Sequence, residues 1–167
     1  MGKIRLFLLI GAVLLLACGC GRNGEEIGTS VSEDTAASFE DNQQKENLIA
    51  DEKEKLSVTE ALAAELEKTI QTDASLTQSE LNEKSYELYM HWDSSLNSIW
   101  GVLKKVLDEE TMQALTKEEL EWIAWKEETV AEAGAQYQGG SIQPLVMNMK
   151  AAELTKERVY ELLELLD

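Results

Sequence analysis

The chain has 167 residues, the length of one ordinary domain with accessory segments. It holds 15 basic and 32 acidic residues, a formal charge of −17 at pH 7. This charge argues strongly against nucleic acid as a partner, because phosphates are repelled by it, and it favours cationic partners instead. The two cysteines are Cys18 and Cys20, so everything after them must be held by packing, without a disulfide.

The first residues have the pattern of a signal peptide. Lys3 and Arg5 precede the apolar run LFLLIGAVLLLA, which is too short to span a bilayer comfortably. The run ends in Leu15-Leu16-Ala17-Cys18-Gly19, which resembles the lipobox of bacterial lipoproteins. The resemblance implies a lipoprotein signal peptide over residues 1–17 and a mature chain that begins at Cys18. The alternatives are an uncleaved anchor helix and a secretory peptide in which Cys18 and Cys20 form some other bond, and we favour the lipobox over both. Cys20 is an alternative lipid acceptor, but Ala17 then stands three positions upstream, where the lipobox has leucine, so we favour Cys18.

Cys18 is therefore the expected site of lipid attachment, with acyl chains such as palmitate that hold the protein on the extracytoplasmic face of the cell membrane. Removal of residues 1–17 takes away Lys3 and Arg5 and no acid, so the formal charge of −17 becomes about −19. A body of this charge is repelled by anionic lipid headgroups while the lipid keeps it attached.

Two segments separate Cys18 from the expected domain. Residues 18–47 are rich in acidic and small polar residues and hold few large apolar ones. Such a segment cannot bury enough apolar surface to offset the entropy of ordering, so we predict a flexible acidic linker. Residues 48–74 have leucines at loosely helical spacing and an alanine-rich stretch. They predict a helix that is either a spacer or a packing helix on the domain.

Residues 75–167 are expected to form the folded domain. Thr77 and Glu80 have the spacing of a capping box, which predicts that a long helix starts there and runs to about Asp108. A second box, Thr116 to Glu119, predicts another helix start, with that helix running towards Tyr137. All four tryptophans fall between residues 92 and 125, and this clustering predicts the position of the core.

The second of these helices has two lines of apolar residues and therefore two faces to cover. Trp122 and Trp125 belong to one of these lines. The helix is expected to end at Gly139-Gly140 at the latest, with Ser141 capping a segment that begins at Ile142. Thr155 is expected to cap the last helical segment or to bend the chain into it. No alternating run indicates a strand, so the fold class is all-α, a small antiparallel helical bundle.

No catalytic constellation is visible in the domain. His91 is the only histidine and has no cysteine near it in the sequence, so we expect no metal and no other cofactor. Ser141 follows two glycines but fits neither a nucleophile elbow nor a phosphate loop. We therefore expect a protein that is not an enzyme and that acts by binding.

A family resemblance extends from Tyr86 to Leu166, about half of the chain. It rests on three groups of residues: Trp92, Leu96-Asn97, Leu120, Trp122-Ile123 and Lys126 on the two helices, the turn Gly139-Gly140-Ser141, and Leu154-Thr155-Lys156-Glu157-Arg158-Val159 near the end. Together they resemble the LprI-like family of lysozyme inhibitors, small helical domains on exported bacterial proteins. Members of that family commonly carry cysteines in this domain, and this chain has none there.

The resemblance implies a protein that binds and inhibits lysozyme or a related muramidase, a cationic protein partner that suits the negative charge of this chain. The alternative is a non-enzymatic adaptor of the cell envelope that docks another exported or membrane protein. The resemblance also suggests which residues to examine as a binding or organising set, although each has a purely structural explanation as well: Asn97, Gly139, Gly140, Ser141 and Arg158.

Overall fold

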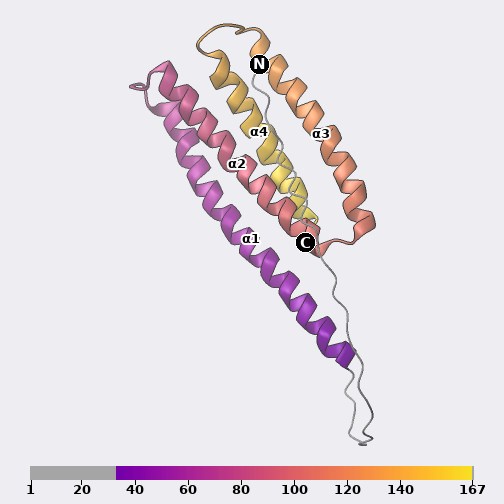
Figure 1. Ribbon diagram of the computed structural model, residues 1–167. Helices are drawn as coiled ribbons and strands as arrows, with labels where there is room; N and C mark the ends of the chain where they lie inside the picture. Colours follow the sequence, from indigo (N-terminus) through magenta and orange to yellow (C-terminus); the bar gives the residue numbers. More distant parts are fainter. Residues whose placement is uncertain (1–32, 167) are drawn as a thin grey trace, which may run out of the picture.

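The computed structural model describes residues 33–166, which form four α-helices (Figure 1). Among these residues there is no strand, so the all-α prediction is confirmed. The predicted signal peptide, Cys18 and the first half of the predicted linker lie outside the described residues. None of the described helices is both long enough and apolar enough to cross a membrane.

The first helix, α1, spans Glu33–Thr72 and begins far upstream of the expected point. The prediction of a flexible linker up to residue 47 is therefore wrong for residues 33–47, which continue directly into the segment expected to be a spacer or packing helix. Pairs four residues apart stabilise this part of the helix surface. Lys45 Nζ lies 3.0 Å from Asp41 Oδ2, and Gln43 donates a hydrogen bond to Asn47.

The second half of α1 packs against its neighbour rather than acting as a spacer. Leu56 and Ala63 belong to the buried core. Glu52 is only 1% exposed and accepts a hydrogen bond of 2.8 Å from Ser98 Oγ on α2. Buried carboxylates are tolerated when they are hydrogen-bonded, so this contact fixes the register between the two helices.

Helix α2 spans Gln78–Val106, and its predicted capping box is confirmed. The Thr77 side chain accepts from the backbone N–H of Glu80, and the Glu80 carboxylate accepts from the backbone N–H of Thr77 at 2.8 Å. Two backbone donors that the helix leaves unpaired are satisfied in this way.

Helix α3 spans Glu109–Ala135, so the predicted start at Thr116 is wrong. The N-cap is Asp108, whose carboxylate accepts from the backbone N–H of Thr111 at 2.9 Å. An aspartate is among the strongest N-cap residues, and the acidic first turn after it suits the helix dipole. Thr116 lies inside the helix, where its hydroxyl donates to the carbonyl of Met112.

Helix α4 spans Gln143–Glu164 and has Pro144 in its first turn, as expected. Two expectations around it are wrong. Its N-cap is Ile142 and makes no side-chain hydrogen bond, so Ser141 does not cap it. Thr155 neither caps nor bends the chain, because it is fully buried inside one continuous helix.

The helices lie side by side in the order α1, α2, α4, α3 (Figure 1). Helix α4 packs most extensively against α2, while α1 lies against α2 and α3 lies against α4. Successive helices run antiparallel, so α2 and α4 are parallel. The side chain of Asn148 donates a hydrogen bond to the carbonyl of Asn82 near the starts of both helices, and the ring centroids of Tyr160 and Trp92 lie 6.1 Å apart further along. The central pair is covered on both sides by more acidic helices.

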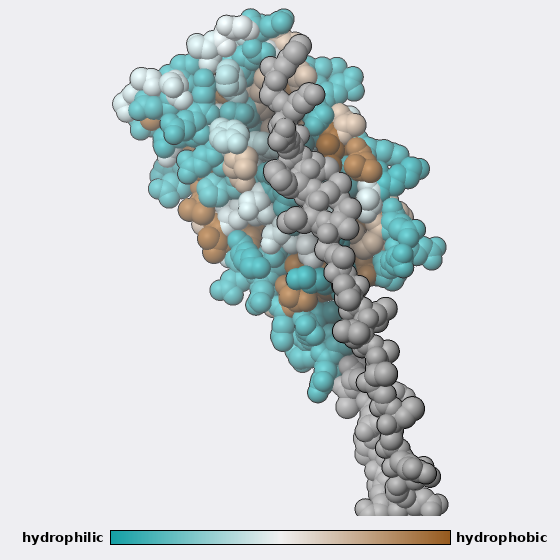
Figure 2. Space-filling model, in the orientation of Figure 1, coloured by the Kyte–Doolittle hydropathy of each residue, from teal (hydrophilic) through white to brown (hydrophobic). Residues whose placement is uncertain are grey.

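The core runs along α2 and α4. Its largest fully buried apolar side chains are Trp92, Leu88, Ile99, Leu103, Leu162 and Val159. Each contributes about 1.5–3 kcal/mol by burial. The tryptophan clustering predicts the core correctly for Trp92, but it is wrong for Trp125, which is 49% exposed. Figure 2 shows mostly hydrophilic residues on the visible face, with hydrophobic ones in small separate patches.

Candidate functional site

The turn between α3 and α4 contains three of the residues singled out from the sequence. Gly139 has φ of 76°, a left-handed conformation that glycine adopts without strain, and its N–H donates to Gln143 Oε1 at 2.9 Å. Gly140 donates its N–H to the carbonyl of Tyr137. The carbonyl of Ser141 accepts from Asn82 Nδ2 at 2.9 Å, which ties the turn to the start of α2.

Asn97 lies elsewhere on α2 and belongs to a different set of contacts. Its side-chain amide donates to the carbonyl of Asp93 at 2.7 Å and to the carboxylate of Asp93 at 3.2 Å. The same carboxylate accepts from the hydroxyl of Tyr89 at 3.3 Å. Asn97 is 15 positions after Asn82, about 22 Å along the helix, so it is not part of the turn's surroundings.

Lys126 of α3 lies close to two aromatic rings, those of Tyr89 on α2 and Trp122 on α3. It is buried, and its Nζ lies 5.5 Å from the ring centroid of Tyr89 and 4.8 Å from that of Trp122. The faces of aromatic rings attract cations, so the two rings provide a partly desolvated cation–π site. Burial lowers the pKa of the Lys126 amine, and the nearby carboxylates of Asp93, Glu119 and Glu127 oppose that effect.

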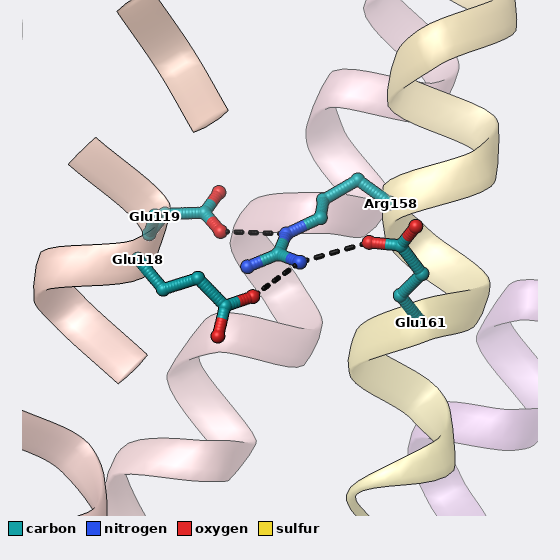
Figure 3. A network of polar contacts seen from close by, with 4 residues as sticks. All are labelled: Glu118, Glu119, Arg158 and Glu161. Carbon is teal, nitrogen blue, oxygen red and sulfur yellow. Dashed lines mark hydrogen bonds and ion pairs between the residues drawn. The ribbon is translucent and has the colours of Figure 1, made fainter. Parts of the chain in front are cut away.

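Arg158 of α4 lies near Trp122, with its Cζ 5.8 Å from the ring centroid. Its guanidinium forms a network of ion pairs (Figure 3). Its Nε–H donates to Glu119 at 2.9 Å, and its Nη1 lies 2.8 Å from both Glu118 and Glu161. Arg158 is 5% exposed and Glu119 8%, whereas Glu118 and Glu161 reach out towards solvent. The network joins α3 to α4 across their interface.

The electrostatics of this pair follow from burial and pairing together. Burial raises the pKa of the Glu119 carboxyl, against the opposing effect of Arg158. Burial by itself lowers the pKa of the Arg158 guanidinium, but hydrogen bonds to Glu161, Glu119 and Glu118 outweigh it and raise that pKa. Nη2 of Arg158 is buried and makes no hydrogen bond to any residue from 33 to 166. The guanidinium stays charged and keeps α3 in place.

These contacts form one continuous set, which we call the inner cluster. It contains residues of α2, α3 and α4: Tyr89, Asp93, Asn97, Glu119, Trp122, Lys126 and Arg158. Of the five residues singled out from the sequence, the structure therefore brings Asn97 and Arg158 into one cluster. Gly139, Gly140 and Ser141 form a separate turn.

The inner cluster organises the fold rather than offering reactive groups. No set of three or more His, Cys, Asp or Glu in the described part of the chain is arranged to hold a metal. His91 is outside the cluster, with its Nε2 4.0 Å from Glu87. Glu119, Lys126 and Arg158 are buried, and the two rings that they contact are half-buried, so the chemistry of the cluster is that of an interhelical clamp.

Sequence reasoning assigned two members of this cluster incorrectly or incompletely. Glu119 was interpreted as part of a capping box. Lys126 was named only as one of the residues that carry the family resemblance. A usable signal exists in the spacing, because Glu119, Trp122 and Lys126 follow one another at steps of three and four and so share one face of α3. This spacing predicts that the three side chains lie on one face of the helix, but it does not predict that this face is buried.

Comparison with known protein families gives one match. The family model described as "Lysozyme inhibitor LprI" matches residues 69–162, which include all of α2 and α3 and nearly all of α4. A search of curated proteins and a search of solved structures returned no match. Since the family model covers more than half of the 167 residues, the chain belongs to the LprI lysozyme inhibitor family.

Proposed function

We propose that this chain is a membrane-anchored extracytoplasmic lipoprotein that binds and inhibits lysozyme or a related muramidase. The observation that carries the proposal is the family match over residues 69–162. The matched region contains both the inner cluster and the turn at residues 139–141, so the matched features lie in one folded unit.

The distribution of charge supports a cationic partner. Helix α3 holds eight acidic and two basic residues, a formal charge of −6, and α1 holds eleven and four, a charge of −7. The two central helices, α2 and α4, each carry four acidic and three basic residues, a charge of −1. The acidity is thus concentrated on the two outer helices, where it attracts a cationic enzyme such as a common lysozyme and increases the association rate.

The rigidity of the helical unit also suits an inhibitor. The turns between helices are short, and the inner cluster fixes α3 against α2 and α4 through ion pairs and cation–π contacts. A surface held in one conformation loses little entropy when it binds, so more of the contact free energy appears as affinity. Such a unit inhibits by covering the enzyme, without any chemical step.

Membrane attachment rests on the sequence pattern around Cys18. A lipidated Cys18 followed by a long acidic segment positions the helical unit in front of the membrane, where an incoming muramidase reaches the cell wall. Labelling cells with a clickable fatty acid is expected to mark the chain, and Cys18→Ala is expected to abolish the label. A label that persists in Cys18→Ala and is lost in Cys20→Ala would contradict the choice of Cys18.

The inhibition is tested by measuring muramidase activity on cell-wall substrate with increasing amounts of the purified full chain, at low and at physiological ionic strength. Saturable inhibition at both is the expected result, with weaker apparent affinity at the higher salt. Inhibition that disappears at physiological salt would indicate charge attraction without a specific site. No inhibition at either salt would contradict the proposal and favour the envelope adaptor.

A further inference from the structure

The outward face of α3 combines an exposed aromatic ring with free carboxylates. Glu121, Trp125, Glu128 and Glu132 follow at steps of four, three and four, so they form one stripe along the helix. Trp125 is 49% exposed, although the sequence pattern placed it on a line that another element should cover. We call these four residues the α3 outer face.

The carboxylates of this face differ from those of the inner cluster in being free to bind. Glu118 and Glu119 on the same helix are already bound by Arg158. Glu128 and Glu132 form no ion pair with any residue in the range 33–166, and Glu121 has only a long 3.9 Å contact with the highly exposed Lys117. The stripe is therefore an unpartnered helix face with uncompensated negative charge.

We propose that the α3 outer face is the surface that docks the muramidase, with Trp125 as the central contact and the three glutamates binding Lys and Arg side chains around it. This inference rests on the proposed function and assigns its binding surface. A tryptophan is the ring most suited to a guanidinium or an ammonium, and exposed tryptophans are frequent centres of binding energy. Carboxylates around such a ring match a cationic enzyme in charge.

Helix α1 provides the competing surface. Glu54, Val58, Leu62 and Glu65 also form an exposed stripe, with Val58 56% and Leu62 43% exposed. This stripe has no aromatic ring, and it lies outside residues 69–162, the part of the chain that matches the inhibitor family. The α3 outer face lies inside the matched region and has the better chemistry for a cation.

The test uses the full chain and compares two sets of substitutions, each with one exposed apolar side chain cut to alanine and one pair of exposed glutamates changed to lysine. On α3 these are Trp125→Ala and the pair Glu128→Lys with Glu132→Lys. On α1 the matched controls are Leu62→Ala and the pair Glu54→Lys with Glu65→Lys. The inhibition constant for a cationic lysozyme is expected to rise about tenfold or more for each α3 variant and less than about twofold for the α1 controls.

Circular dichroism is expected to show the same helix content in all variants, since every substituted position is exposed. If the unmodified chain inhibits and the α3 and α1 variants lose affinity equally, the effect is one of overall charge and the assigned surface is wrong while the proposed function stands. If the α1 variants lose more, the docking surface is on α1. If the unmodified chain neither binds nor inhibits, the function and the surface fail together.

Discussion

The two faces of α3 carry the same kinds of residues and have opposite surroundings. The inner face presents Glu119, Trp122 and Lys126 to α2 and α4, and its buried charges lie against Arg158 or aromatic rings. The outer face presents Trp125 and Glu128 to solvent, without a cationic partner among the described residues. The first set therefore stabilises the helical unit, whereas the second is exposed and makes no ion pair with another described helix.

The largest effect is expected from breaking the inner ion pair. Arg158→Ala leaves the buried Glu119 carboxylate without its cation, and the free energy of unfolding is expected to fall by about 3–5 kcal/mol. Urea denaturation measures this loss. The matched control is the double variant Arg158→Met with Glu119→Leu, which removes both charges, keeps most of the volume and is expected to recover much of the stability. A single variant that loses less than about 1 kcal/mol would show that the pair does not hold α3.

A smaller effect is expected in the turn that joins α3 to α4. Gly139 has φ of 76°, so Gly139→Ala imposes a strained left-handed alanine and is expected to cost about 1–2 kcal/mol. Gly139→Asn is expected to cost less, because asparagine tolerates this conformation better. A Cβ at Gly139 would meet nothing within 4 Å, so equal loss in both variants would contradict the assignment of the effect to backbone conformation.

The pH dependence of stability tests the inner cluster in another way. Burial and the nearby Asp93 raise the pKa of Tyr89 from 10.0 to about 12. Below pH about 10 the phenol is protonated in both states and its contribution to stability is fully present. Between about 10 and about 12 the unfolded chain ionises first, so the free energy of unfolding falls as the pH rises.

Tyr89→Phe is expected to make that fall shallower, by an amount on the order of 1 kcal/mol at the end of the range. Burial and Glu60 raise the pKa of Tyr160 to about 12 as well, so part of the slope remains in the variant. Chemical denaturation at a series of alkaline pH values gives both slopes. If the free energy of unfolding falls with pH at the same slope in Tyr89→Phe and in the unmodified chain, Tyr89 is accessible to solvent.

The smallest effect on stability is expected on the outer face. Glu128→Lys with Glu132→Lys changes exposed positions that contact no other helix through an ion pair, and the free energy of unfolding is expected to stay within about 0.5 kcal/mol of the unmodified chain. Thermal unfolding at physiological salt measures this difference. A loss above about 1 kcal/mol would show that this face also serves the fold, which would remove the distinction between the two faces.

Local patterns predicted much of this fold because short-range chemistry determines it. Thr77 and Glu80 lie within one turn and cap α2 as expected, and Pro144 fits the first turn of α4. The start of α3 was placed wrongly because Asp108 and Thr116 are both competent caps, and only the position of the preceding helix decides between them. Helix α1 extends back to Glu33, and the helix propensity of residues 33–47 was not recognised because their acidic composition suggested a flexible linker.

The inner cluster was less accessible to sequence reasoning because its partners come from three helices. Arg158 and Glu119 are 39 positions apart in the chain, so their pairing depends on how α3 crosses α4. The periodicity placed Trp122 and Trp125 on one line, which is wrong: Trp122 lies against Arg158 of α4, whereas Trp125 is 49% exposed on the other face of α3.

The most direct test of the two-face account is hydrogen–deuterium exchange of the full chain with and without a cationic lysozyme. We expect lysozyme to slow exchange in peptides covering residues 118–132 of α3, with no change in peptides covering residues 54–65 of α1. Protection confined to α1 or to the turn at residues 139–141 would contradict it.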